Sequence, residues 1–159
     1  DKKTYFFRGN FVYKYDEKKM KIQAGFPKNI KDVFKGVPNN INAVFTWAKD
    51  GVTYFFKGPF YYKYNDALKK VEKGYPKRAN RRWKNMPLII DAIFSLPFSL
   101  ENTPPFKQNM PSTYIISGEN SYVLDPVNDS VILSKKIDDR FMGLNITGAE
   151  LNPVSQKKE

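Results

Sequence analysis

Aromatic residues occur along this chain in short runs that are separated by turn residues. The clearest example spans residues 53–64, where Lys57-Gly58-Pro59 separates two aromatic segments. Aromatic side chains favour strands and Gly-Pro marks a turn, so the pattern predicts a β-hairpin. We expect its rings to point inward, with Lys57 and Lys63 at the solvent-exposed edges.

The same pattern occurs three times in the chain. Residues 4–15 repeat it closely, and residues 113–124 repeat it more weakly. The segment Gly74-Tyr75-Pro76-Lys77 matches Gly25-Phe26-Pro27-Lys28 at an offset of 49 residues, and Ile90–Phe94 matches Ile41–Phe45 at the same offset. A period of this length, with several strands per unit, is typical of propeller blades, which must stack to bury their faces.

Each unit is predicted to contain an inner strand, a hairpin, a fourth strand and a short helix. Inner strands are expected at 41–45 and 90–94. The first helix is expected at 29–36, with Asn29 as its N-cap and Gly36 at its end. Trp83 takes the helix position of Phe34 in the second unit, and residues 137–143 repeat the helix pattern in the third.

These elements predict an all-β fold of antiparallel blades, with about four strands and one short helix in each. The propeller domain is expected over residues 1–145, with blades at about 1–40, 41–89 and 90–145. The first blade lacks its inner strand and is therefore incomplete. The segment 95–111 carries four prolines and is expected to be an exposed loop. Residues 146–159 are expected to form a flexible polar tail.

The absence of two residue types excludes several kinds of chemistry. The 159 residues include no Cys and no His. A disulfide, an HExxH zinc site, a Ser-His-Asp or Cys-His arrangement and haem ligation by imidazole are therefore impossible. No apolar run is long enough to span a membrane, and no signal peptide is visible before the first strand pattern. We predict that the chain is not an enzyme and holds neither haem nor zinc.

The formal net charge of +11 favours polyanionic partners. Glu72 alone opposes a basic run in the second unit, which consists of Lys69, Lys70, Lys73, Lys77, Arg78, Arg81, Arg82 and Lys84. We expect this surface to bind heparan sulfate, other acidic matrix polymers or anionic membranes. The alternative is a solvated basic face that keeps the domain soluble. Specific nucleic-acid binding is not expected, because no groove-reading motif is present.

The motifs Ile-Asp-Ala-x-Phe, Tyr-Phe-Phe-Lys-Gly and Gly-Tyr-Pro-Lys resemble hemopexin-like repeats, which form the four-bladed C-terminal propeller of most matrix metalloproteinases. The resemblance covers residues 1 to about 144 and is weakest in the third repeat. It implies a non-catalytic module that recognises substrate, inhibitor or extracellular matrix for a matrix-metalloproteinase-like protein. Such a module acts outside the cell or at its surface. The alternative is a free-standing structural or storage-like repeat protein that binds polyanions.

The chain departs from this family pattern in two ways. Three of the expected four repeats are present, and no Cys is available for the disulfide that usually ties the first and last blades. An incomplete ring exposes blade faces and strand edges, which favours association, so a homodimer is a candidate assembly.

The resemblance also implies an ion in the central channel. Its ligands are expected to be the backbone carbonyls of Asn42 and Asp91, with Ala43 and Ala92 one step further along. Carbonyl oxygens suit hard cations such as calcium or sodium, and chloride is expected nearby. The alternative is a channel that holds only water. Two sequons, at Asn128 and Asn145, predict glycosylation if the protein is secreted.

Overall fold

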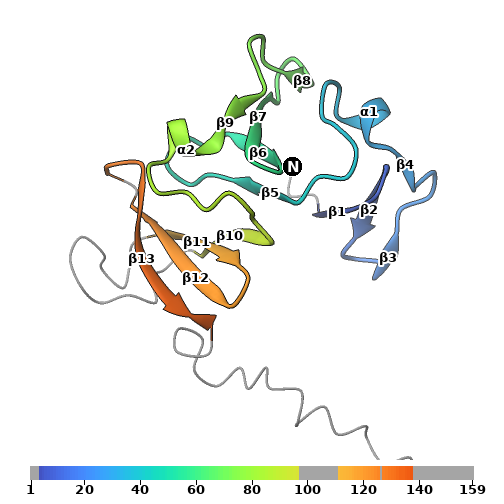
Figure 1. Cartoon of the computed structure of the whole chain (residues 1–159). Helices are drawn as coiled ribbons and strands as arrows, with labels where there is room; N and C mark the ends of the chain where they lie inside the picture. The colour runs from blue at the N-terminus through green and yellow to red at the C-terminus, as the bar shows by residue number, and fades with distance from the viewer. Residues whose placement is uncertain (1–3, 97–110, 126, 138–159) are drawn as a thin grey trace, which may run out of the picture.

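The computed structural model describes residues 4–96, 111–125 and 127–137, which form three antiparallel sheets (Figure 1). The first sheet contains β1 (Thr4–Arg8), β2 (Phe11–Asp16), β3 (Lys21–Ile22) and β4 (Lys28–Asn29). The second contains β5 (Ala43–Thr46), β6 (Thr53–Lys57), β7 (Phe60–Asn65), β8 (Lys70–Val71) and β9 (Lys77–Arg78). The third contains β10 (Ala92–Leu96), β11 (Ser112–Ser117), β12 (Asn120–Asp125) and β13 (Ser130–Lys136).

Each sheet contains a hairpin, formed by β1 and β2, by β6 and β7, and by β11 and β12, which confirms the prediction from the repeats. The three hairpin turns have a glycine in the left-handed region, with φ of 60° at Gly9, 53° at Gly58 and 57° at Gly118. In the second sheet Tyr54 to Phe56 are buried, as predicted. Phe60 is the exception, because more than a third of its side chain is exposed beside the turn.

The inner strands β5 and β10 lie side by side, and the strands of both sheets follow outward in chain order (Figure 1). Among the described residues β1 pairs only with β2, so the first sheet has no inner strand. Its outer strand consists of two pieces, β3 and β4, and β8 and β9 repeat this in the second sheet. The third sheet has one continuous outer strand, β13, where the Gly-aromatic-Pro-Lys element is missing from the sequence.

Several predicted boundaries were wrong by a few residues. The inner strands begin at Ala43 and Ala92, because only single backbone bonds precede them, from the Asn42 and Asp91 N–H groups to the carbonyls of Phe56 and Ile116. Strand β10 extends through Leu96, so the predicted loop at 95–111 starts later, and its residues 97–110 lie outside the described ranges.

The predicted helices are also shorter than expected. They are reduced to α1 (Ile30–Val33) and α2 (Ala79–Arg82). Asn29 occupies the N-cap position of α1, but its side chain makes no capping hydrogen bond. In the third unit only Ile137 of the predicted helix is described, and the tail at 146–159 lies outside the described ranges. Neither of these four-residue helices could cross a membrane, and the described part of the chain contains no helix that could.

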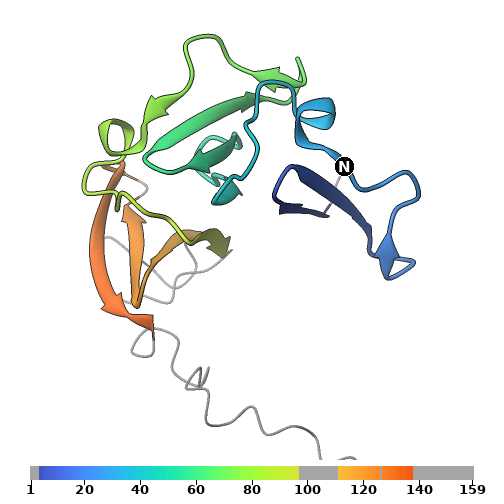
Figure 2. The same cartoon turned by 45° about the vertical axis from the view of Figure 1, so that its right-hand side comes forward.

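The end of each described helix joins its own sheet to the next one (Figure 2). After α1, the Phe34 ring lies 5.4 Å from the ring of Phe55 and 5.5 Å from that of Tyr64, both in the second sheet. The carbonyl of Lys35 accepts a 2.8 Å hydrogen bond from the N–H of Val71 in β8. After α2, Trp83 is fully buried in the cluster that reaches Ile115, Leu124 and Val131 of the third sheet. The Lys84 carbonyl there accepts a 2.8 Å bond from the Val131 N–H.

Candidate functional site

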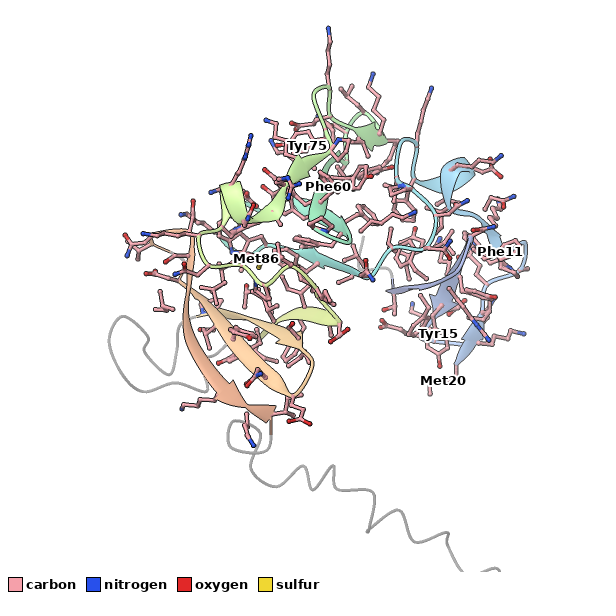
Figure 3. All side chains as sticks on the ribbon, in the orientation of Figure 1. Phe11, Tyr15, Met20, Phe60, Tyr75 and Met86 are labelled. Atoms are coloured by element: carbon pink, nitrogen blue, oxygen red, sulfur yellow. The ribbon has the colours of Figure 1, made fainter. Side chains whose placement is uncertain are left out.

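A groove of about 580 Å³ lies on the second sheet, beside β9 and α2. Its lining combines basic and apolar residues: Phe60, Tyr61, Pro76, Lys77, Arg78, Arg81 and Arg82. Phe60 and Tyr75 lie on this side of the second sheet in Figure 3. No acidic residue lines the groove in the described part of the chain.

The short strand β9 positions two of the cations. It pairs with β7 so that Arg78 lies opposite Phe60 and Lys77 lies opposite Tyr61. The Arg78 guanidinium lies 5.5 Å from the centroid of the Phe60 ring, and the Lys77 ammonium lies 4.7 Å from that of Tyr75. Such cation–π contacts restrict these side chains while leaving their charges exposed. Helix α2 follows β9 directly and adds Arg81, which is also exposed.

Arg82 has a different role from its neighbours. Its guanidinium donates to the carboxylate of Asp129, in the turn before β13, and lies 5.1 Å from the Trp47 ring centroid. Asp129 also accepts a 2.6 Å bond from Lys49 Nζ. Burial alone would lower the pKa of Arg82, but the hydrogen bond and the charge of Asp129 outweigh this effect and raise it. Arg82 therefore ties the second sheet to the third and contributes less free charge to the groove.

The expectation that Glu72 alone opposes the basic run was wrong. Asp129 pairs with Arg82 from 47 residues away, in a repeat whose sequence is degenerate. Asp66 lies 3.9 Å from the exposed Lys69, and Glu72 pairs at 3.0 Å with Lys63, outside the basic run. Lys69, Lys70, Lys73 and Lys84 do not line the groove, so the structure brings together only four of the eight predicted residues.

Asp129→Asn is expected to weaken the tie between the second and third sheets and to flatten the acid side of the stability curve. Burial would raise the pKa of Asp129, but hydrogen bonds from Arg82 and Lys49, with their charges, lower it below its ordinary value. Such a carboxyl stabilises the fold above its unfolded-state pKa, and this contribution is lost as pH falls through the folded-state pKa. At pH 7 we expect the variant to be less stable by about 1–2 kcal/mol.

Urea unfolding at a series of pH values measures this effect. The difference in unfolding free energy between the original chain and Asp129→Asn should shrink between about pH 5 and about pH 2. Asp66→Asn is the matched control, because its pair with Lys69 is long and exposed, and we expect a change below about 0.5 kcal/mol. A constant difference across this pH range would contradict the assignment.

The side chains of Asn42 and Asp91 have a role that the sequence reasoning missed. Asn42 Oδ1 accepts a 2.7 Å hydrogen bond from the N–H of Gly58, and Asp91 Oδ2 accepts one of the same length from the N–H of Gly118. Each side chain therefore fastens the hairpin turn of its own sheet. This contact could have been predicted from the sequence, because Asn or Asp recurs before each described inner strand and Gly recurs in each hairpin turn.

A cation beside these strands remains a prediction. The described residues contain no group of three or more His, Asp or Glu side chains that could hold a metal. Backbone carbonyls next to Ala43, which is buried, and Ala92, which is exposed, are the right type of donor for calcium or sodium. Two carbonyls are fewer than the roughly six to eight oxygens that calcium takes, so water or further strands would have to complete the shell.

The sequon at Asn128 lies in the exposed turn between β12 and β13. Its amide Nδ2 donates a 2.8 Å hydrogen bond to Asp125, and the hydroxyl-bearing Ser130 of the sequon is buried. Asn145 lies outside the described residues. Glycosylation at both positions remains a prediction.

Comparison with known proteins relates the chain to hemopexin-type domains. It is 49% identical to interstitial collagenase from Bos taurus over 43 residues. This alignment covers 27% of this chain and 9% of the relative. It is 43% identical to stromelysin-1 from Mus musculus over 44 residues, and this alignment covers 28% of this chain and 9% of the relative. The chain thus matches only about a tenth of the length of these relatives.

Solved structures with similar folds cover much more of the chain. The hemopexin fold protein CP4 from cow pea matches with a TM-score of 0.64 and 21% identity, over 88% of this chain and 65% of that one. The seed albumin LS24 from Lathyrus sativus matches with a TM-score of 0.66 and 20% identity, over 89% of this chain and 65% of that one. At this identity the likeness shows the propeller fold.

The model of the hemopexin family matches residues 1–39 and 41–87, which is more than half of the chain. These ranges contain the first two sheets, both described helices and the groove. The chain therefore belongs to the hemopexin family.

Proposed function

We propose that this chain is a non-catalytic binding module whose basic groove binds a sulfated polysaccharide of the heparan sulfate type. The carrying observation is the groove itself, in which exposed Lys77, Arg78 and Arg81 converge without an opposing carboxylate. The planar guanidinium group binds charged oxyanions through paired hydrogen bonds, and an ammonium adds a point charge. The exposed ring of Phe60 offers an apolar surface to the sugar between two sulfates.

Comparison between the two repeats supports a role other than folding. The positions equivalent to Lys77, Arg78 and Arg81 in the first unit are Lys28, Asn29 and Asp32. The first unit forms the β2–β4 pairing, which is equivalent to β7–β9, and the short helix α1 without this cluster of charge. Lys77 is shared with the first unit, where Lys28 lies over the ring of Phe26, but Arg78 and Arg81 are not. The two arginines are therefore not required by the blade, and ligand binding is the role that we assign to them.

The proposal places the module outside the cell or at its surface, within a matrix-metalloproteinase-like protein. The matches to interstitial collagenase and stromelysin-1 support this context. There the module would hold its parent protein on the matrix, near substrates or inhibitors, without taking part in bond cleavage.

The variant Lys77→Gln/Arg78→Gln/Arg81→Gln tests the site. We expect its affinity for immobilised heparin at about 0.15 M salt to fall by about tenfold or more, because three ionic contacts and their counterion release are lost. The matched control Lys18→Gln/Lys19→Gln/Lys28→Gln removes the same charge from exposed positions in the first unit. Its affinity should fall by about threefold or less.

Equal losses in the two variants would show that net charge, and not the groove, causes binding. No retention of the original chain on heparin at physiological salt would overturn the proposal. Retention on collagen alone would instead indicate a protein partner in the matrix. A chain that binds neither polymer would fit the alternative of a structural or storage-like repeat protein.

A further inference from the structure

The outer edge of the second sheet carries cations well beyond the groove. Strand β9 pairs with the start of β7, where Arg78 lies opposite Phe60, and β8 pairs with the end of β7, where Lys70 lies opposite Asn65 (Figure 1). Phe60 and Asn65 are five residues apart in β7, so the two cations lie at levels separated by roughly 17 Å along the edge. A ligand that fills only the groove therefore contacts one end of this edge.

A second cluster of cations lies at the other end of the edge, and one of its members comes from the first unit. The carbonyl of Lys35 accepts a 2.8 Å hydrogen bond from the N–H of Val71, and Lys35 forms a bridge with Lys70. Lys73 follows β8 along the same edge. All three lysines are exposed, and we call Lys35, Lys70 and Lys73 the far cluster. The basic run in the sequence did not include Lys35, because this residue belongs to the preceding repeat.

Both carboxylates of segment 66–73 have a basic partner. Glu72 lies between the groove and the far cluster, where its N–H donates a 2.9 Å hydrogen bond to the carbonyl of Lys63. Its carboxylate lies 3.0 Å from Lys63 Nζ, and the hydrogen bond between the two side chains raises the pKa of Lys63. Asp66 lies 3.9 Å from the exposed Lys69. These pairs reduce the repulsion that a polyanion would meet along the edge.

The other two sheets do not gather the same cations. In the third sheet Lys84 holds the position of Lys35, but its bridge partner is Ser130 and not a lysine. In the first sheet Ala24 holds the position of Lys73. Both sheets still form an outer strand, so the far cluster as a whole is not required by the blade.

We propose that one sulfated polysaccharide chain binds the groove and the far cluster together and follows the outer edge of the second sheet between them. This inference rests on the function proposed above, and it adds a second contact region and a minimum length of ligand. A short oligosaccharide in the groove reaches only Lys77, Arg78 and Arg81. A longer chain also reaches the far cluster, and this second contact adds affinity because the two binding groups are linked in one molecule.

A length series of heparin oligosaccharides tests this path. Affinities from the disaccharide to the decasaccharide are measured by competition against immobilised heparin at about 0.15 M salt. The variant Lys35→Gln/Lys70→Gln/Lys73→Gln removes the far cluster. We expect its affinity for the decasaccharide to fall by about tenfold, because three ionic contacts are lost, and its affinity for the disaccharide to change by less than about twofold.

Two variants described above serve as references in this series. Lys77→Gln/Arg78→Gln/Arg81→Gln should lose affinity for both lengths, because both occupy the groove. Lys18→Gln/Lys19→Gln/Lys28→Gln removes the same charge from the first unit, and its affinity for the decasaccharide should fall by about threefold or less.

Glu72→Gln provides a measurement in which affinity is gained. The substitution releases the Lys63 ammonium in the middle of the path, so we expect the affinity for the decasaccharide to rise by about threefold. The affinity for the disaccharide should change by less than about twofold. Glu17→Gln is the matched control, since it makes the same change of charge at an exposed position in the first unit, and its effect should be smaller.

The outcomes separate this inference from the proposed function. If the groove variant loses affinity for the decasaccharide while the far-cluster variant does not, the groove binds alone and the extended path is wrong. If neither variant differs from the first-unit control, the groove and the path both fail. Equal losses of disaccharide and decasaccharide affinity in the far-cluster variant would also overturn the path, because they would show a general effect of charge.

Discussion

Trp83→Ala is expected to lower the free energy of unfolding by about 3–5 kcal/mol, which is a large part of the stability of a domain of this size. Trp83 is fully buried, and its ring contacts five aromatic rings of the second unit. Their centroids lie between 4.9 and 6.4 Å from that of Trp83, and they belong to Phe45, Trp47, Tyr54, Phe56 and Tyr61. Truncation to Ala would leave a cavity that these stiff rings cannot close.

Trp83→Phe is the informative control, because the first unit has Phe34 at the equivalent position. The indole Nε1 of Trp83 is buried and has no hydrogen-bond partner in the described part of the chain, so this substitution removes an unsatisfied donor. We expect it to cost about 1–2 kcal/mol, for lost volume alone. Phe11→Ala is the surface control, since Phe11 is exposed, and about 0.5 kcal/mol is expected.

Urea unfolding followed by far-ultraviolet circular dichroism measures all three variants, since it does not depend on the removed indole. Equal costs for Trp83→Ala and Trp83→Phe would mean that the aromatic cluster does not depend on a ring at this position. A cost of Trp83→Ala near that of Phe11→Ala would contradict the placement of Trp83 at the junction of the second and third sheets.

The repeats predicted the fold well because the same strands and hairpin recur with the same pattern of aromatic residues in each unit. Positions such as Phe7 and Phe56 recur at an offset of 49 residues because the same pleated surface is packed in each unit. The strand boundaries were less predictable. The sequence around Asn42 and Asp91 has the pattern of a strand, but each of these residues makes only a single backbone hydrogen bond before the paired strand begins. The continuous strand β13 was not predicted. The third repeat lacks the Gly-aromatic-Pro-Lys element, which divides the outer strand into two pieces in the other two repeats.

The candidate site was predicted only in part, for a different physical reason. Lys77, Arg78 and Arg81 are close in sequence, so a short strand followed by a helix keeps them together in space. Arg82 belongs to the same run, but its partner Asp129 lies in the least regular repeat. The pairing of Arg82 with Asp129 cannot be predicted from composition or from the charges close to Arg82 in the sequence. The turn contacts of Asn42 and Asp91 likewise depend on hairpin geometry that spans 16 and 27 residues.

Gly36→Ala is expected to lower the free energy of unfolding by about 2–4 kcal/mol through two separate effects. Gly36 has φ of 87°, where a side chain is strained. A Cβ at this position would also lie 3.0 Å from Cβ of Val71 in the neighbouring sheet. Val71 cannot easily move away, because its N–H is bonded to the Lys35 carbonyl and its branched side chain is restricted at χ1. The substitution therefore acts on the junction between the first and second sheets.

Gly25→Ala separates the two effects, since Gly25 has φ of 82° but no atom within 4 Å of the Cβ position. It should show the conformational cost alone, about 1–2 kcal/mol. The second unit has Asn85 at the position of Gly36, with φ of 61°, so a left-handed residue is required there even without glycine. If urea unfolding gives equal costs for the two alanine variants, the contact with Val71 contributes nothing. A larger cost at Gly36 measures how tightly the helix end of one unit is packed against the outer strand of the next.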